Sequence, residues 1–346
     1  MKSIQTSNYG SSKSLGLKPF FIILMAIGLN RAFAQQTNPP DAEKVVAPKV
    51  LPGRGAAQFD FFYAGEGKAR NMYIVRKGKI AWSYIDTTGK GEISDAILMA
   101  NGNVLFAHQF GITLIDKNKK VLWNYDAPEG FETHTAQPIG ADRVVFVQNG
   151  NPAKVFVMNI LTNKIEKEFL LPFKGGTHGQ IRHARLTAAG TLLVAHMDLG
   201  KVCEYDSNGK ELLSIDVPSV WSAVPLKNGN ILVASNQAFV REIARNGTIV
   251  WDYPLAGVPG YKLTNPQLAL RLPNGNTIIN NWFNQWNGGV DAANPPVQAI
   301  EVTPGKKIVW ALRSWAYPLN LGPSTTIQLL NNPDGITENV HFGDIK

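Results

Sequence analysis

The stretch Ala96–Leu105 (AILMANGNVL) returns twice along this chain, as Ala223–Leu232 (AVPLKNGNIL) and Ala269–Ile278 (ALRLPNGNTI). Two weaker copies begin at Ala136 and Ala184, so that successive copies start 40, 48, 39 and 46 residues apart. A period of this size, with several short strands in each repeat, is typical of a β-propeller. We therefore expect an all-β ring of repeated sheets.

Each repeat predicts a blade of four strands, because turn residues divide it into four short runs. An aliphatic pair followed by tryptophan marks the fourth strand, at Trp82, Trp123, Trp251 and Trp310, and we expect these indoles to pack between neighbouring blades. Five whole blades are predicted, at about 92–126, 134–171, 181–217, 220–254 and 265–313.

The two ends of the chain predict a sixth blade that closes the ring. The N-terminal part supplies third and fourth strands at 72–75 and 80–84, and the C-terminal part supplies first and second strands at 326–330 and 336–342. A shared blade removes the open sheet edges without a disulfide. The prediction is a six-bladed propeller of four-stranded blades.

The first 34 residues have the features of a signal peptide. Lys13 and Lys18 precede an apolar stretch at 20–29, and Ala32-Phe33-Ala34 offers a cleavage site. Ten apolar residues are too few for an ordinary membrane span, so we expect none after signal removal. The sequence predicts export to a periplasm or the medium, an extended lead-in at 35–69 and one propeller domain at 70–346.

Composition excludes several classes of protein. The 346 residues are 44% hydrophobic and 17% charged, as in a folded globular protein. The net charge of +8 falls to +4 without the four basic residues of the signal, and no nucleic-acid partner is expected. Cys203 is the only cysteine, so no internal disulfide is expected, and it is interpreted as a buried core residue.

The ring brings histidines that are far apart in the sequence to one rim. The first strand of a blade lies nearest the axis and neighbouring strands are antiparallel, so the start of the first strand and the end of the second share a face. His178 falls in a loop on that side, and five other histidines align to the rim itself: His108, His134, His183, His196 and His341. The alternative is that they bond buried water or backbone.

Long loops lie on the same predicted face, and functional residues concentrate on such loops. An insertion at 282–296 carries Trp282, Phe283 and Trp286, whose rings are suited to stack on a sugar or an aryl group, or else to pack over the mouth of the ring. The candidate ligand-binding residues are His108, His196, Trp221, Gln267, Trp282 and Trp286.

Neutral histidines can accept a proton, attack as nucleophiles or bind a metal. His134 and His183 are the candidate catalytic residues, with Arg182 or Arg185 holding an anionic group. The chain has no compact metal motif, so a divalent ion would need ligands from different blades. It also has no Gly-x-Ser-x-Gly elbow and no phosphate loop.

The repeated Asn-Gly-Asn, Gly-Lys and aliphatic-Trp phrases resemble those of the PQQ-like, or quinoprotein-like, propeller superfamily over about residues 70–330. Arg182-His183-Ala184-Arg185-Leu186 and His134 resemble phrases of the arylsulfotransferase-type propellers. That resemblance implies that His183 or His134 accepts a sulfuryl group beside Arg182. Compared with the arylsulfotransferase-type propellers, this chain is shorter and lacks their doubled His-His-Asp phrase. PQQ itself is not expected, because the eight blades and Trp-rich docking repeat of the quinone enzymes are missing.

Three functions remain open at this point. The leading hypothesis is an exported propeller that binds a carbohydrate or aryl compound at the histidine-rich and aromatic face. The second is an enzyme, either a sulfuryl transferase or a metal-assisted lyase, that uses the same histidines. The third is a scaffold that binds protein partners through its outer or short-turn face and leaves the histidines structural.

Overall fold

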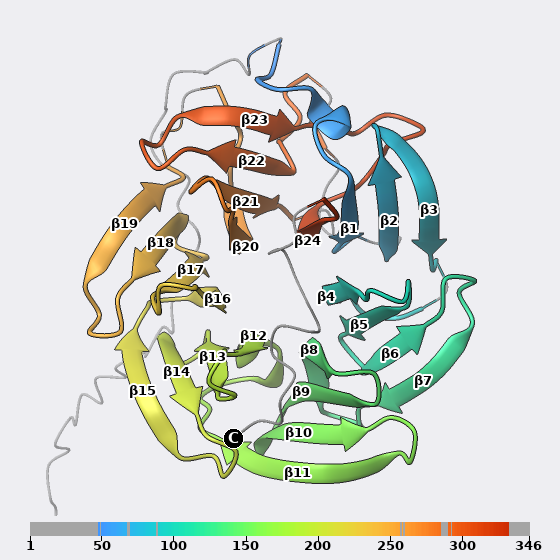
Figure 1. Cartoon of the computed structure of the whole chain (residues 1–346), viewed down its shortest axis with the longest axis vertical. Coiled ribbons are helices and arrows are strands. Elements are labelled where there is room, and N and C mark those ends of the chain that lie inside the picture. Colours follow the sequence, from blue (N-terminus) through green and yellow to red (C-terminus); the bar gives the residue numbers. More distant parts are fainter. Residues whose placement is uncertain are drawn as a thin grey trace, which may run out of the picture. The chain divides into compact units, whose positions relative to one another are not determined.

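The computed structural model describes Pro48 and residues 50–67, 70–87, 89–256, 258, 260–284, 290–291 and 293–331. Within these residues 24 strands form six antiparallel sheets of four strands each, arranged as blades around a common axis (Figure 1). The prediction of a six-bladed propeller is confirmed. The predicted signal peptide, Trp286 and His341 lie outside the described residues. Among the residues described, no helix has the length and hydropathy to span a bilayer.

Five blades consist of consecutive strands, numbered here along the chain and given from the axis outward. Blade 1 holds β4 (Ile93–Leu98), β5 (Val104–His108), β6 (Gly111–Ile115) and β7 (Val121–Asp126). Blade 2 holds β8 (Glu132–Ile139), β9 (Arg143–Asn149), β10 (Ala153–Asn159) and β11 (Lys164–Leu171). Blade 3 holds β12 (Ile181–Leu186), β13 (Leu192–His196), β14 (Lys201–Tyr205) and β15 (Glu211–Asp216). Blade 4 holds β16 (Val220–Pro225), β17 (Ile231–Ser235), β18 (Phe239–Ile243) and β19 (Ile249–Pro254). Blade 5 holds β20 (Asn265–Arg271), β21 (Thr277–Trp282), β22 (Ala299–Val302) and β23 (Ile308–Leu312).

The sixth blade joins the two ends of the chain, but not as the sequence suggests. It contains β24 (Ser324–Leu329), β1 (Phe61–Gly65), β2 (Asn71–Arg76) and β3 (Lys79–Ile85), in that order. The predicted strand at 336–342 lies outside the described residues, and the second position of the blade is held instead by β1, which pairs with both β24 and β2. This strand lies inside the segment interpreted as an extended lead-in. All five of its residues are buried, so it shows no alternation of polar and apolar residues to mark it as a strand.

Adjacent blades are held together by six apolar clusters, one at each blade interface. The cluster between blades 5 and 6, for example, contains Trp310 together with Phe61 and Tyr63. The four tryptophans of the outer strands also donate a hydrogen bond to the neighbouring blade or the segment before it: Trp82 to Lys117 O, Trp123 to Asn163 Oδ1, Trp251 to Pro304 O and Trp310 to Gly55 O, at 2.8–3.1 Å. The role predicted for these indoles is confirmed.

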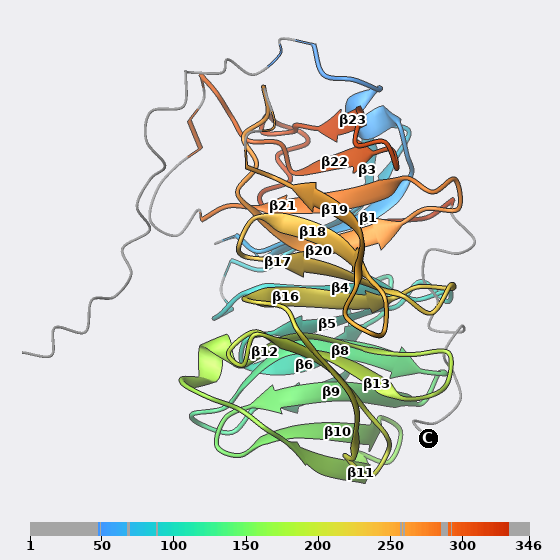
Figure 2. The ribbon, with the colours of Figure 1, turned by 90° about the vertical axis from the view of Figure 1, so that its left-hand side faces the viewer.

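The innermost strand of every blade carries a β-bulge close to its first residue. Pairing with the second strand skips one residue in five blades and two in blade 5. The skipped residues are Ser94, His134, Arg182, Trp221, Gln267 with Leu268, and Thr325. A bulge increases the local twist and re-aims a side chain. The inner strands run between the two faces of the ring (Figure 2), so these positions gather around one end of the axis.

Candidate functional site

Polar side chains from all six blades meet at the end of the axis where the inner strands begin. We call this group the axial cluster; it consists of Glu66, Glu92, Ser94, Glu132, His134, His178, Arg182, Trp221 and Gln267. Most of these side chains are buried, but 54% of the His178 side chain is exposed. Solvent therefore reaches the cluster at the His178 edge.

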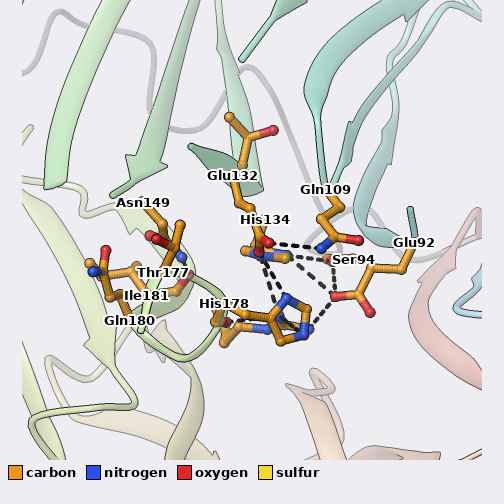
Figure 3. Close-up of polar contacts among 12 residues, drawn as sticks. Glu92, Ser94, Gln109, Glu132, His134, Asn149, Thr177, His178, Gln180 and Ile181 are labelled. Atoms are coloured by element: carbon orange, nitrogen blue, oxygen red, sulfur yellow. Dashed lines mark hydrogen bonds and ion pairs between the residues drawn. The ribbon is translucent and has the colours of Figure 1, made fainter. Parts of the chain in front are cut away.

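The two imidazoles of the axial cluster share one carboxylate (Figure 3). His134 Nε2 lies 2.9 Å and His178 Nδ1 2.8 Å from the same oxygen, Glu132 Oε2. The rings meet edge to face, with centroids 5.1 Å apart. On its other side His134 Nδ1 lies 2.9 Å from Ser94 Oγ, which is also 3.1 Å from Glu92 Oε1. Each ring is thus held in one orientation by its Nδ1 partner.

Arg182 lies at the centre of this arrangement. Its Nη1 is 3.3 Å from Nε2 of both His134 and His178, and its Nη2 donates to Glu92 Oε1. The guanidinium also stacks on Trp221, with Cζ 4.2 Å from the ring centroid. Its Nε is buried without a hydrogen-bond partner among the described residues. One cation therefore contacts two imidazoles, a carboxylate and an indole.

The carboxyl groups of the axial cluster have opposite protonation preferences. Burial and the nearby charge of Glu92 raise the pKa of Glu66 well above its usual value. Burial would also raise the pKa of Glu92, but Arg182 and His134 outweigh it and hold that pKa well below normal. Hydrogen bonds from His134, His178 and Gln109 likewise overcome burial and lower the pKa of Glu132. Near neutral pH, Glu92 and Glu132 are therefore carboxylates, whereas the surroundings of Glu66 favour its protonated form.

A second polar group, called here the inner network, lies further along the same strands and consists of Asp95, Thr135, His183 and Arg185. Arg185 binds Asp95 through two hydrogen bonds of 2.8 and 2.6 Å, and the Thr135 hydroxyl donates to the same carboxylate at 3.0 Å. Burial lowers the pKa of His183 to about 3, with a further contribution from Arg185. His183 is therefore a neutral, enclosed side chain.

The structure separates the residues that the sequence groups together. His134, Arg182, Trp221 and Gln267 lie in the axial cluster, whereas His183 follows Arg182 on β12 but belongs to the inner network. Arg182 is the residue that the bulge in β12 skips, and a bulge re-aims a side chain, which accounts for this separation.

His108 and His196 lie at the same end of the ring but bond within their own blades. His108 Nε2 is 3.1 Å from Thr113 Oγ1, and His196 Nε2 is 2.9 Å from the Tyr205 hydroxyl. Burial lowers the pKa of each imidazole to about 4. Trp282 ends β21, where its carbonyl accepts a hydrogen bond from Thr264. These contacts tie both imidazoles to their own blades, whereas the contact of Trp282 is made by its backbone.

Sequence reasoning missed two acidic residues of the axial cluster, Glu92 and Glu132. Each stands two positions before the bulged residue of its blade, Ser94 or His134, and the two are 40 residues apart like the repeats themselves. A search for acids at equivalent repeat positions would have found them. Sequence alone does not show that Glu92 turns toward Arg182, or Glu132 toward the two imidazoles.

Three side chains of the axial cluster are placed to hold a metal ion. Glu92, His134 and His178 each offer one ligand atom, and these atoms lie within 4.8 Å of one another. Two imidazole nitrogens and one carboxylate oxygen form a donor set suited to a first-row divalent ion.

Comparison with known proteins supports the fold. Neither models of protein families nor curated protein sequences gave a match to this chain. Among solved structures, a protein of unknown function from Bacteroides caccae is 23% identical, with a TM-score of 0.68 over 78% of this chain and 98% of that one. A streptogramin B lyase is 14% identical, with a TM-score of 0.52 over 78% of this chain and 86% of that one. A catalytically inactive virginiamycin B lyase from Staphylococcus aureus, solved with quinupristin, is also 14% identical, with a TM-score of 0.51 over 76% and 88% of the two chains. At these identities the likeness shows a β-propeller and nothing about activity.

Proposed function

We propose that this chain is an exported β-propeller that binds a small ligand, a carbohydrate or aryl compound, at the axial cluster. The observation that carries the proposal is the convergence of three carboxyl groups, two imidazoles and one guanidinium from four blades at one end of the axis. Export is supported by the charged, apolar and small-residue order of residues 1–34.

The axial cluster is a costly way to stabilise a fold. Removing charges from water costs several kcal/mol per ion, and apolar residues of similar volume often serve stability equally well. Groups with strongly shifted pKa values, concentrated in one place, are more typical of functional sites.

The accessible parts of the cluster indicate the kind of ligand. The partly exposed Trp221 offers an aromatic face, and His178 and Glu132 offer a donor and an acceptor near solvent. An aromatic face beside a few fixed polar groups is suited to a sugar ring or an aryl group.

Calorimetric titration of the purified chain with a panel of oligosaccharides and aryl glycosides tests the proposal. We expect saturable binding that weakens at least tenfold in Trp221→Ala and in His134→Ala. Arg245→Ala is the matched control, because Arg245 pairs with Glu204 at 2.7 Å between blades 4 and 3, away from the axial cluster. No binding across the panel, or equal losses in the control, would contradict the proposal.

Sulfuryl transfer is the second candidate, favoured by the 3.3 Å between His134 Nε2 and Arg182 Nη1. In such a reaction an N–S bond forms at His134 while the S–O bond to a phenol breaks and the phenolate leaves. His134 fits the acceptor role better than His183, because His134 contacts Arg182 and lies edge to face with the half-exposed His178. Release of phenolate from an aryl sulfate, abolished in His134→Ala but retained in His183→Gln, would favour this candidate over simple binding. A chain without either activity would be better described as a protein scaffold.

A further inference from the structure

We propose that Glu92, His134 and His178 form a site for a divalent transition-metal ion, and that Arg182 competes with the ion for this site. The inference rests on the proposed function in one respect, because it names a ligand of the same axial cluster. It adds a specific ligand set and a residue that controls its occupancy.

The donor atoms are of the right kind and come from three blades. Glu92 precedes β4, His134 lies on β8 and His178 lies in the short helix η2 (Thr177–Gly179) before β12. Their ligand atoms lie within 4.8 Å of one another, so small side-chain rotations would bring them to one ion. Two histidines and one glutamate, with further positions left open, are a common ligand set for zinc.

The residues around the ligands orient them toward a common point. Glu132 Oε2 accepts from His178 Nδ1, and Ser94 Oγ lies 2.9 Å from His134 Nδ1. His178 thus has its Nδ1 occupied and keeps its Nε2 for an ion, whereas His134 Nε2 also lies 2.9 Å from Glu132 Oε2, a contact that a bound ion would replace. A carboxylate or hydroxyl on the far nitrogen of a ligating histidine sets its tautomer and ring orientation.

The guanidinium of Arg182 marks that common point. Its Nη1 lies 3.3 Å from both inward Nε2 atoms, and its Nη2 contacts Glu92. A metal ion and the guanidinium cannot occupy this space together, because both are cations and both need the same electron pairs. Metal binding therefore requires Arg182 to move away.

Arg182 has the means to leave this position. Arg182 extends from β12 of blade 3 on a long, flexible side chain, and its Nε has no hydrogen-bond partner within the described residues. The guanidinium stacks on the ring of Trp221. The native affinity for metal includes the cost of breaking the contact of Arg182 Nη2 with Glu92 and the 3.2 Å hydrogen bond that Nη1 donates to the His178 carbonyl. Replacing Arg182 with an uncharged residue of similar length removes that cost.

Calorimetric titration of the full chain with Zn²⁺ alone, after dialysis against a chelator, tests the inference. We expect one ion per chain in the wild type, at least tenfold tighter binding in Arg182→Met and at least tenfold weaker binding in His178→Ala. His178 is exposed, so its replacement should not disturb folding. Arg245→Met and His108→Gln are the matched controls and should bind as the wild type does.

Three outcomes would overturn the inference: no Zn²⁺ bound by either the wild type or Arg182→Met, unchanged affinity in His178→Ala, or binding by Arg182→Met alone. The last result would show that the native protein uses its guanidinium in place of a metal. Repeating the carbohydrate and aryl titrations in the presence of chelator separates the two proposals. If the carbohydrate or aryl compounds still bind in chelator and the protein binds no Zn²⁺, the proposed function is supported. The metal site is then ruled out.

Discussion

Two arginines of strand β12 each pair with a buried carboxylate, and the two pairs differ in how many of their hydrogen-bonding groups have partners. Arg182 pairs with Glu92 and Arg185 with Asp95, and each carboxylate lies 90 residues earlier in the chain. Arg185 makes a two-point contact with Asp95, and the Thr135 hydroxyl and the Ala136 amide complete that carboxylate's bonds. Arg182 makes one contact with Glu92, shares two imidazoles and keeps an unpartnered Nε.

The difference separates a structural ion pair from a candidate functional one. In the inner network each charge has a fixed partner, so the group holds blades 1, 2 and 3 in register. In the axial cluster the two imidazoles share one carboxylate, Glu132, and one guanidinium nitrogen, Arg182 Nη1. One of these imidazoles, that of His178, is exposed to solvent. Buried charges kept in such an arrangement are better explained by ligand binding than by stability.

Breaking the inner network should have the largest effect on folding. Asp95→Ala removes the partner of Arg185 and leaves a buried charge, so we expect the free energy of unfolding to fall by about 3–5 kcal/mol. Arg182→Met should cost less, because Ser94 and His134 remain within 3.1 and 3.4 Å of Glu92. Urea denaturation followed by tryptophan fluorescence measures both. Equal losses in the two variants would remove the distinction between the two arginine pairs.

Acid should weaken the fold partly through the inner network. His183 titrates at about 3 in the folded chain, against about 6.5 when unfolded. Its contribution is complete above pH 6.5 and is lost as the pH falls toward 3, since the unfolded chain binds the extra proton in that window. The slope approaches about 1.4 kcal/mol per pH unit.

We expect His183→Gln to flatten the pH dependence of stability between pH 6.5 and 3, measured by urea denaturation at several pH values. Some dependence should remain, because burial also lowers the pKa of His108 and His196 to about 4. If the stability of the variant changes with pH in parallel with that of the wild type, His183 does not contribute to the loss of stability in acid.

Removing one hydroxyl from the inner network should have an intermediate effect. The Thr135 hydroxyl donates to Asp95 and accepts from the Ala184 amide at 3.0 Å. Thr135→Val leaves that buried amide unpaired and should lower the free energy of unfolding by about 1–3 kcal/mol. Thr135→Ser keeps the hydroxyl and is the control, so a similar loss in both would implicate packing instead.

Changing the exposed edge of the axial cluster should have the smallest effect on stability. His178→Ala should leave the free energy of unfolding within about 0.5 kcal/mol of the wild type, because the side chain is half exposed. Thermal unfolding by circular dichroism measures this change. A loss of more than about 1 kcal/mol would assign His178 a structural role like that of Thr135.

Local repeats made much of the fold predictable. Asn-Gly turns and aliphatic-Trp strands repeat within short windows, so the limits of the five whole blades agree with the structure to within about two residues. The strands of the sixth blade were harder to predict from the sequence. β1 is buried on both faces, and a short, uniformly apolar strand resembles any other apolar run.

The site was only partly predictable for a related reason. Repeat alignment brought His134, Arg182, Trp221 and Gln267 to one rim, because equivalent positions of a ring lie at the same height. It did not indicate that the side chains of Glu92 and Glu132 would lie in the axial cluster. It also did not indicate that His183 would belong to the inner network while its neighbour Arg182 belongs to the axial cluster. Those outcomes depend on side-chain direction around a bulge, which is set by pairing with the next strand.

The sequence by itself determined how many blades there are, in what order they follow and which residues occupy equivalent places, since these depend on turns and strands only a few residues long. The tertiary structure alone decided which charges meet. Glu92 and Arg182 are 90 residues apart, and only closure of the ring, with a bulge in each inner strand, places one carboxylate against one guanidinium.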